Sequence, residues 1–423
     1  MRITISLVLF YFLAPVLLIY LTHISKTINK IGAVVMAYLL GLLFGNIGIL
    51  PRASEAFRAL LAGKAKLPAE QVAQYFDQGT ITGSDVVANQ VFSIQDMIMT
   101  IVIPLAIPLL LFSLDMKRWL KLAREAMFSM VLGLVSLLIV IFAGYFLFHD
   151  KIAESWKVAG MLIGVYTGGT PNLAAIATAV DVSPNTFILT HTYDLVLGAL
   201  CLFFILTLAQ RTFNLFLPHF HENHKHIKLA QVVKESEGVD NYIGMLTKRG
   251  ALQLGKALLL SVLIFAIGGA LSLLVSPSAQ MVTVILTITT LGLIIGSLKS
   301  VSRIEKTFQL GMYFIIVFSL VVSSMADLSN MFRIDFLHLF IYVAIAVFGS
   351  MIVHVGLSWI FKVDSDTTII TITALTYSPP FVPVVASALK NKEVIISGLT
   401  IGILGYAFGN YLGVGIAFLL KGF

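Results

Sequence analysis

Long apolar stretches recur along the whole chain, and they constrain its fold more than any other feature. Most have roughly 17–25 residues, the length that an α-helix needs to cross a hydrocarbon core of about 30 Å. We count twelve such stretches, which are Ile3 to Tyr20, Ile31 to Gly48, Ile98 to Phe112, Ala126 to Phe148, Val158 to Val180, Phe187 to Leu208, Leu252 to Val275, Met281 to Leu298, Phe308 to Met325, Phe336 to Phe361, Thr367 to Leu389 and Val394 to Leu420. The pattern predicts an all-α, polytopic membrane protein of about 12–13 transmembrane helices.

Composition and charge point to the same class. Hydrophobic residues make up 58% of the chain and charged residues 12%, whereas soluble domains are about half apolar and about a quarter charged. The net charge of +7 reflects Lys and Arg in short loops such as Lys117 to Arg124 and Lys299 to Lys306. The positive-inside rule places such loops in the cytoplasm, so the charge does not indicate nucleic-acid binding. We expect a multi-pass protein of the cell membrane, of the bacterial inner or cytoplasmic type.

The two halves of the sequence resemble each other. Pro171 opens the segment PNLAAIATAV, and Pro380, 209 residues later, opens PFVPVVASAL. We therefore predict two structural repeats, inverted relative to each other, each with one discontinuous helix. The alternative is a pair of ordinary proline kinks, which neighbouring helices tolerate. The predicted divisions are residues 1–208 (first repeat, panel helices and then core helices 126–208), 209–250 (polar linker) and 251–423 (second repeat, panel helices and then core helices 336–420).

Each half also carries a pair of glycines four positions apart. Gly41 and Gly45 in the first half have counterparts in Gly292 and Gly296 in the second. Small residues at this spacing let two membrane helices approach closely, so we predict that both pairs lie at helix contacts.

The number of crossings conflicts with the positions of the basic loops. If the Lys117 to Arg124 loop is cytoplasmic, the five stretches that follow it place the Lys299 to Lys306 loop outside, against the positive-inside rule. An inverted repeat fails for the same reason, because partners six crossings apart point in the same direction. One further crossing between Val180 and Leu298 would remove both conflicts and give thirteen crossings, with the N-terminus outside and the C-terminus inside.

The polar linker, Arg211 to Gly250, contains four closely spaced histidines, which are His219, His221, His224 and His226. This spacing is compatible with metal binding or with pH sensing. Solvated histidines beside Lys225 and Lys228 are the simpler interpretation.

The fifth stretch of each half is interrupted by Gly, Pro and polar residues. Backbone groups freed at membrane depth must be satisfied by protein, water or ligand, so a break of this kind is typical of a transporter binding site. The N-terminal ends of half-helices attract anionic groups, and unwound carbonyls hold cations. We expect the substrate to bind at the two breaks, which are Thr167, Gly168, Gly169, Thr170, Pro171 and Asn172 in the first half and Thr376, Tyr377, Ser378, Pro379 and Pro380 in the second.

The helix after the first break carries an ionisable residue near the bilayer centre. His191 and Thr190 precede Asp194 by three and four residues, so the three side chains share one helical face. A charge there costs at least ~2.5–3.5 kcal/mol on insertion scales and is typical of ion or proton handling. We predict that this group binds the coupling ion, with Na⁺ at Asp194 the only metal ion expected. Asn410, at the comparable place in the second half, is predicted to offer a neutral oxygen ligand. The alternative is an Asp–His pair that only joins two helices.

The segment YTGGTPNLAAIATAV, followed by a helix with a polar pair, resembles the YjcL-like membrane proteins over nearly the whole chain. This family is catalogued as domain of unknown function eight-one-nine, and Gly168, Gly169, Thr170 and Asn172 match its most specific element. It is grouped with cation/proton antiporters and with bile-acid and glutamate sodium symporters. The resemblance implies a panel, or dimerisation, domain and a mobile core domain in which two discontinuous helices cross. It also implies that Asp194 takes the place of the cation-binding Asp of the antiporters, although Tyr193 stands where electrogenic antiporters carry a second acid.

Together these features predict a secondary active transporter that moves a small monoanionic or zwitterionic solute by alternating access coupled to Na⁺ or H⁺. A monovalent cation/proton antiporter is the alternative. A channel or an intramembrane enzyme has less support, because the polar residues cluster at the two breaks and no GxxxxGK[ST], HExxH or GxSxG motif occurs. We expect no enzymatic activity and no cofactor. The partners expected are membrane lipid, a small solute or monovalent cation, and a second copy of the chain in a homodimer, with no nucleic acid.

Overall fold

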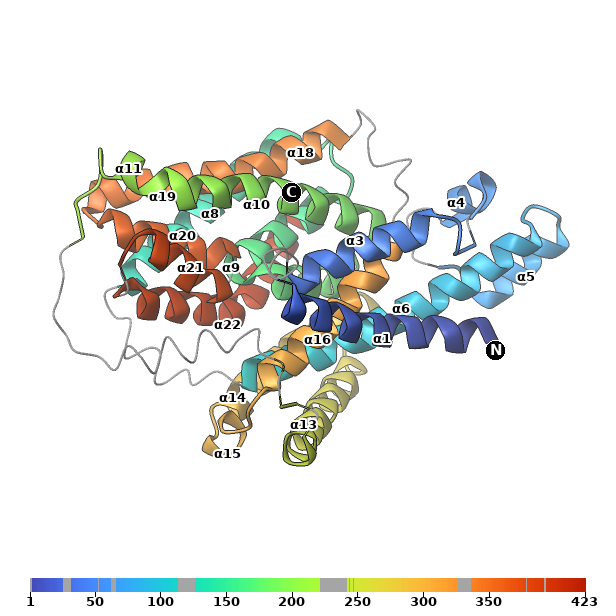
Figure 1. Cartoon of the computed structure of the whole chain (residues 1–423). Helices are drawn as coiled ribbons and strands as arrows, with labels where there is room; N and C mark the ends of the chain where they lie inside the picture. The colour runs from blue at the N-terminus through green and yellow to red at the C-terminus, as the bar shows by residue number, and fades with distance from the viewer. Residues whose placement is uncertain are drawn as a thin grey trace.

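The structure, a computed structural model, describes residues 2–25, 32–51, 53–61, 66–112, 126–220, 242, 244–245, 247–325, 336–377, 379–391 and 393–423. Every regular element in this part of the chain is a helix (Figure 1). The elements are α1 (Arg2–Ile24), α3 (Ala33–Asn46), α4 (Glu55–Leu61), α5 (Ala69–Asp77), α6 (Gly83–Phe112), α8 (Ala126–Phe148), α9 (Ser155–Ala179), α10 (Pro184–Thr207), α11 (Ala209–Phe213), α13 (Lys248–Ser272), η1 (Pro277–Ala279), α14 (Gln280–Gly296), α15 (Lys299–Ser302), α16 (Thr307–Ser324), α18 (Leu337–Ala344), η3 (Ile345–Gly349), α19 (Ser350–Phe361), α20 (Ser365–Tyr377), η4 (Pro379–Phe381), α21 (Val382–Ala388) and α22 (Val394–Lys421).

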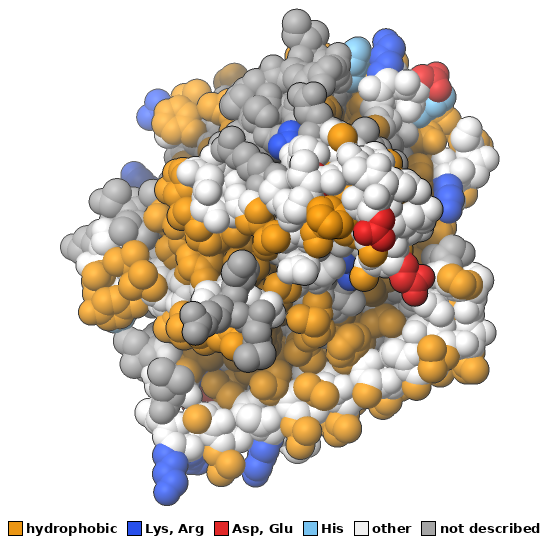
Figure 2. Space-filling model, turned by 90° about the vertical axis from the view of Figure 1, so that its right-hand side faces the viewer, with side chains coloured by type: hydrophobic (Ala, Val, Ile, Leu, Met, Phe, Trp, Pro, Cys, Tyr) orange, Lys and Arg blue, Asp and Glu red, His pale blue; other side chains and the backbone are white. Residues whose placement is uncertain are grey.

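Eight helices among the described residues are long and apolar enough to cross a membrane, and these are α1, α6, α8, α10, α13, α16, the continuous α18–η3–α19 and α22. Helices α3 and α14 are shorter and also apolar. Many large hydrophobic side chains on these helices are exposed, and Figure 2 shows hydrophobic side chains spread over one face with Lys and Arg mostly near its margins. Apolar surface of this extent suits contact with lipid. The prediction of an all-α, multi-pass membrane protein is confirmed.

The helices pack in two sets. Helices α1, α3, α6, α13, α14 and α16 contact one another, and they lie toward the right and bottom of Figure 1. Helices α8, α9, α10 and α18 to α22 form the second set, on the left. The first set holds the first three membrane helices of each predicted half, and the second set holds the remainder. This is the grouping expected of panel and core domains, although the domain boundaries and the repeat itself stay predictions.

Both glycine pairs lie where a helix of one half meets a helix of the other. A Cβ added to Gly41 of α3 would lie 2.0 Å from Ser323 Oγ of α16. A Cβ added to Gly296 of α14 would lie 2.7 Å from the carbonyl oxygen of Leu111 of α6. Any side chain would separate these helices, so glycine permits their close contact, as the spacing predicted.

Helix α9 doubles back on itself at the predicted break. Tyr166 has φ −90° and ψ 17°, and Gly169 has φ 67° and ψ −161°, so the backbone leaves the helical region at both residues. The two arms then run side by side, because a Cβ at Gly164 would lie 2.5 Å from Cδ1 of Ile176. The left-handed φ of Gly169 is open to glycine at little cost and reverses the chain direction. We name α9 hairpin 1.

The two ends of hairpin 1 meet. The Ser183 backbone N–H donates to Glu154 Oε2 at 3.2 Å, although a continuous helix would place these residues about 43 Å apart. The first arm, residues 155–166, is about 18 Å long and reaches roughly the middle of a 30 Å hydrocarbon core. Hairpin 1 is therefore re-entrant, and it returns to the face from which it enters.

The second interrupted segment has the same form. Helix α20 ends at Tyr377, and η4 and α21 carry the chain back. Asn391 Nδ2, in the turn after α21, donates to Asp366 Oδ2 in the first turn of α20 at 2.9 Å. Gln210 Nε2 of α11 donates to Asp366 Oδ1 at 2.9 Å and to the Leu389 carbonyl oxygen at 3.3 Å. We name α20, η4 and α21 hairpin 2.

The two hairpins enter from opposite membrane faces, and helix α22 shows this because it packs along both. Near its N-terminal end, a Cβ at Gly398 would lie 2.7 Å from both Ile370 and Val382, one from each arm of hairpin 2. Near its C-terminal end, the Phe418 ring lies 5.8 Å from the ring of Trp156 in the first turn of hairpin 1. Since α22 itself crosses the membrane, the open ends of the hairpins lie on opposite sides.

Re-entrant hairpins correct the predicted topology. The stretches Val158 to Val180 and Thr367 to Leu389 are not among the eight membrane-length helices of the described chain, and these eight together with the shorter apolar α3 and α14 make five helices in each half. Two repeats with inverted topology require an odd number of crossings in each half, and five meets this requirement. The family resemblance implied that the two discontinuous helices cross each other, which differs from what the structure shows. They return on themselves, because each chain reversal is made at the break.

The basic loops agree with this count. A Cβ at Gly296, at the end of α14, would lie 3.1 Å from Cα of Phe112, at the end of α6. The chain therefore leaves both helices at the same membrane face, which the positive-inside rule assigns to the cytoplasm. With one crossing fewer, the two basic loops fall on one face without the predicted extra crossing between Val180 and Leu298; that crossing and the placement of the C-terminus opposite the N-terminus stay predictions. The conflict disappears because one crossing is lost, not because one is gained.

Candidate functional site

The tips of the two hairpins rest on neighbouring positions of α22. A Cβ at Gly402 would lie 2.8 Å from Pro379 Cγ, in the tip of hairpin 2. A Cβ at Gly405 would lie 1.7 Å from the Thr167 carbonyl oxygen, in the tip of hairpin 1. Because these glycines are less than one helical turn apart, both breaks come together near the middle of α22.

Asn172 fastens hairpin 1 to α22. Its Nδ2 donates to the Gly405 carbonyl oxygen at 3.0 Å, and its side chain is buried. A Cβ at Gly409, one turn further along, would lie 2.2 Å from the same Nδ2. Glycine at these positions lets the hairpin backbone approach the α22 backbone closely.

The structure places the remaining break residues as follows. Thr167 is buried, and its Oγ1 donates to the Ile163 carbonyl oxygen at 2.8 Å, within its own arm. Gly168, Gly169 and Pro171 are buried in the tip, and Thr170 is half-buried. Thr376 and Tyr377 are half-buried at the end of α20, and Pro379 is buried. Ser378 lies outside the described residues, and so does the side chain of Pro380.

Asp194 lies near the middle of α10, on the face turned toward the hairpins. Its Oδ2 is 3.8 Å from His191 Nδ1, one helical turn earlier, too far for a normal hydrogen bond. The His191 side chain is only 1% exposed and that of Asp194 12%. The rings of Tyr38 and Phe187 lie 5.0 Å and 5.7 Å from the imidazole and cover it. The predicted pairing of these two side chains is present in the structure.

Two tyrosines bring the hairpin tips to Asp194. Tyr166 is the residue at which hairpin 1 begins its turn, and its hydroxyl faces the Asp194 carboxylate. Tyr377 is the last residue of α20, and its hydroxyl donates to the Gly198 carbonyl oxygen at 2.8 Å, one turn beyond Asp194. The Tyr377 hydroxyl also interacts with Asp194 and with Cys201. One face of α10 therefore contacts both tips.

Several buried polar atoms around Asp194 lack a hydrogen-bond partner among the described residues. They are the Tyr166 hydroxyl and both ring nitrogens of His191. Orphaned polar atoms of this kind are rare in folded proteins, because leaving one unpaired costs about 1–3 kcal/mol. A carboxylate, a phenol and an imidazole therefore face one another at this site, and each of them can donate or accept hydrogen bonds.

The side chains of two other predicted members of the ion site make hydrogen bonds to other groups. Thr190 Oγ1 donates to the Thr186 carbonyl oxygen at 2.8 Å, so its hydroxyl proton satisfies its own helix. Asn410 Nδ2 donates to Thr289 Oγ1 of α14 at 3.3 Å, and its Oδ1 is buried without a partner. Asn410 therefore joins α22 to the first set of helices instead of reaching Asp194. Its side chain leaves α22 on a different face from the glycines that receive the tips.

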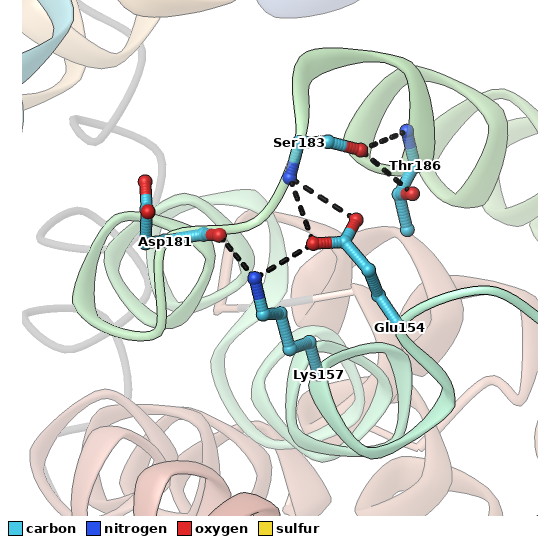
Figure 3. Close-up of polar contacts among 5 residues, drawn as sticks. All are labelled: Glu154, Lys157, Asp181, Ser183 and Thr186. Carbon is cyan, nitrogen blue, oxygen red and sulfur yellow. Dashed lines mark hydrogen bonds and ion pairs between the residues drawn. The ribbon is translucent and has the colours of Figure 1, made fainter. Parts of the chain in front are cut away.

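Polar contacts join the two arms at the open end of hairpin 1 (Figure 3). We call this group the clasp, and its residues are Glu154, Lys157, Asp181, Ser183 and Thr186. Lys157 Nζ donates to Glu154 Oε1 at 2.7 Å and also to the Asp181 carbonyl oxygen. Ser183 Oγ donates to Thr186 Oγ1 at 2.9 Å in the first turn of α10. Burial acts to raise the pKa of the Glu154 carboxyl, but the hydrogen bonds from Lys157 and its neighbours outweigh it, and the pKa lies below its usual range.

A polar cavity of about 310 Å³ lies at the open end of hairpin 2. Its lining includes His219, the one linker histidine that the structure describes, since His221, His224 and His226 lie outside the described residues. Within the described ranges, no group of three or more His, Cys, Asp and Glu side chains is placed to hold a metal ion.

Comparison with known proteins assigns the chain to a family. It matches the family described as "Protein of unknown function (DUF819)" over residues 74–423. The chain belongs to this family. It is also similar to the "Uncharacterized membrane protein YjcL" of Bacillus subtilis (strain 168), with 24% identity over 332 residues that cover 76% of this chain and 82% of that protein. The predicted family is confirmed, whereas the wider grouping with antiporters and symporters stays a prediction.

Proposed function

We propose that this family member is a secondary active transporter whose transport site lies between the two hairpin tips and Asp194. The observation that carries the proposal is the meeting of two re-entrant hairpins, one from each face, on Gly402 and Gly405 of α22. Half-helix ends at mid-membrane are the device by which transporters hold a solute between two gates. Hairpins from opposite faces supply one gate for each side.

The chemistry of the tips favours a small monoanion or zwitterion. Residues 169–171 begin the second arm of hairpin 1, so its free N–H groups and partial positive charge lie at the tip. No Lys or Arg of the described chain lies in either tip, since Lys157 is at the open end of hairpin 1 and Lys390 follows hairpin 2. A dianion would lack a counter-charge here. One negative charge suits the helix ends, and Asp194 can balance an accompanying cation.

Cation/proton exchange without an organic solute is the second candidate. It is favoured by the burial of Asp194 beside His191, which would serve an exchanger equally well. A channel receives less support, because the tips of both hairpins rest against the α22 glycines. We propose no enzymatic activity, because no Ser, Thr or Cys side chain in the described ranges is hydrogen-bonded to Asp194 or His191.

Counterflow in proteoliposomes tests the transporter proposal. Purified protein is first screened for thermal stabilisation by small monocarboxylates and amino acids, since a ligand that binds the folded state raises its apparent stability. Each hit is then loaded inside vesicles and exchanged against labelled solute outside. A carrier shows transient accumulation, whereas a pore shows only equilibration. Cation-driven proton flux without any solute would favour the exchanger.

Cys201 provides a second test that needs no known solute. It is the only cysteine in the sequence, it is buried, and it faces Tyr377 beside the site. A membrane-impermeant thiol reagent should modify it from either side of sealed vesicles if access alternates. Reaction from one side only, in vesicles of both orientations, would contradict a transporter.

A further inference from the structure

We propose that Asn172 and Tyr377 are the positioning residues of the two gates, and that each holds one hairpin tip against a helix from the other half of the chain. The inference rests on the proposed function and assigns the closure of each membrane side to one side chain. Asn172 keeps hairpin 1 closed, and Tyr377 keeps hairpin 2 closed. Two hydrogen bonds of the same kind, one at each tip, carry the inference.

The two tips are fastened crosswise. Hairpin 1 belongs to the first half of the chain, and its Asn172 Nδ2 donates to the Gly405 carbonyl oxygen of α22, in the second half, at 3.0 Å. Hairpin 2 belongs to the second half, and its Tyr377 hydroxyl donates to the Gly198 carbonyl oxygen of α10, in the first half, at 2.8 Å. Each tip is therefore fixed to the crossing helix that follows the other hairpin. We call these two hydrogen bonds the ties.

Both acceptors are carbonyl oxygens of glycines within a helix. A carbonyl oxygen has two lone pairs, so it can accept a hydrogen bond from a side chain as well as one from its own helix. At Gly405 the missing side chain also admits the tip, since a Cβ there would lie 1.7 Å from the Thr167 carbonyl oxygen. Gly198 and Gly405 are 207 residues apart, close to the 209 that separate Pro171 from Pro380. The ties therefore stand at corresponding places in the two halves.

The tips are the parts of the hairpins that can move most easily. The clasp closes the open end of hairpin 1 through several polar contacts. At the open end of hairpin 2, Gln210 and Asn391 both donate to Asp366. In the described part of the chain, more side-chain hydrogen bonds close each open end than join its tip to a neighbouring helix. A hairpin fastened in this way swings about its open end once its tie is broken.

Each tie therefore controls access from one face. When the Tyr377 tie breaks, the tip of hairpin 2 leaves α10, and the site opens toward the face at which hairpin 2 enters. When the Asn172 tie breaks, the tip of hairpin 1 leaves α22, and the site opens toward the opposite face. The two ties share no atom, so one can break while the other holds its gate closed. Alternating access requires this independence.

Modification of Cys201 by an impermeant thiol reagent, added to one face or the other of sealed vesicles, tests the assignment. Tyr377→Phe removes only the hydroxyl, so the rate from the hairpin 2 face should rise about threefold to tenfold relative to the rate from the hairpin 1 face. The Tyr377 hydroxyl also contacts Cys201. The ratio of the two rates is therefore compared, because a change in the reactivity of the thiol itself cancels in that ratio. Asn172→Ala should shift the ratio in the opposite direction by a similar factor.

Tyr313→Phe is the matched control. Its hydroxyl also donates to a carbonyl oxygen of a neighbouring helix, that of Phe12 in α1, at 2.7 Å, but within the first set of helices. This variant should leave the ratio unchanged. Hydrogen exchange gives a second measurement that needs no thiol. Tyr377→Phe should speed amide exchange in the tip of hairpin 2 and leave hairpin 1 unchanged, and Asn172→Ala should do the reverse.

The outcomes separate the ties from the function. Wild-type modification from both faces, with the same ratio in Tyr377→Phe and Asn172→Ala, overturns the ties and leaves the transporter in place. Unchanged exchange at both tips has the same meaning. A shift in one common direction by both variants also overturns the assignment of one residue to each face. If one variant does not fold, the other still decides, because each has its own predicted direction. One-sided modification of the wild type overturns the transporter and the gates with it.

Discussion

The carbonyl oxygen of Thr167, in the tip of hairpin 1, rests against Gly405 of α22, where a Cβ would lie only 1.7 Å from that oxygen. This is well inside van der Waals contact, so no side chain at position 405 is compatible with the observed position of the tip. Through this contact hairpin 1 packs directly on α22, which holds the break at mid-membrane.

Gly405→Ala should therefore displace hairpin 1 and impair transport. Overpacking by one methyl group in a close-packed site costs about 1–3 kcal/mol, which should appear as a lower apparent melting temperature. Gly415→Ala is the matched control on the same helix, because nothing lies within 4 Å of its added Cβ. That variant should be as stable as the wild type or slightly more so, since alanine favours helix. Equal stability and counterflow in the two variants would show that the tip does not rest on Gly405.

Asn172→Ala should weaken the same attachment without adding bulk. It removes the hydrogen bond from Nδ2 to the Gly405 carbonyl oxygen, a loss of about 0.5–1.5 kcal/mol, and leaves a small cavity in the tip. We expect reduced stability together with reduced solute exchange. Asn185→Ala, at an exposed position in the first turn of α10, is the control and should change neither measurement. A fall in stability with wild-type exchange would limit Asn172 to a structural role.

The sequence revealed the membrane class and the places where the helices break, for physical reasons. Apolar length and low charge density determine whether a segment enters a bilayer. A Gly-Gly-Thr-Pro-Asn run cannot continue a helix without special backbone geometry. What it could not reveal was the size of the bend. A kink and a full reversal share the same residues, and the difference lies in the left-handed φ of Gly169 and in the packing of Gly164 against Ile176.

One sequence signal of the reversal was present. The basic loops disagreed with the number of crossings, and losing a crossing restores agreement as well as gaining one. The surface of α22 that contacts the hairpins also had a signal in the sequence. It is a row of glycines on one helical face, which are Gly398, Gly402, Gly405, Gly409 and Gly413. The role of Tyr166 had no such signal, since a tyrosine before a helix break is also common in a hydrophobic core without any function. Only the fold shows that its hydroxyl faces Asp194.

The clasp on hairpin 1 should make stability depend on acid pH. The Glu154 carboxyl has a lowered pKa in the folded protein, so its contribution is complete above the ordinary carboxyl pKa and is lost as pH falls through the lowered value. Glu154→Gln should therefore be less stable than the wild type near neutral pH. The difference should shrink below about pH 4. Melting temperatures measured across this range, with Asp150→Asn at an 84% exposed side chain as the control, test the claim. A constant difference between Glu154→Gln and wild type at all pH values would contradict it.

Cysteine labelling tests the re-entrant topology directly, and the sequence makes it simple. Cys201→Ser leaves the chain without cysteine. Asp150→Cys, Asp181→Cys and Lys390→Cys then place single thiols at exposed positions before hairpin 1, after hairpin 1 and after hairpin 2. If hairpin 1 returns to its own face, an impermeant maleimide should label positions 150 and 181 from the same side of the membrane. Position 390 should be labelled from the other side, because hairpin 2 opens beside the opposite end of α22. Labelling of 150 and 181 from opposite sides would mean that α9 crosses the membrane. The two tips would then no longer enter from opposite faces, and the proposed pair of gates would be lost.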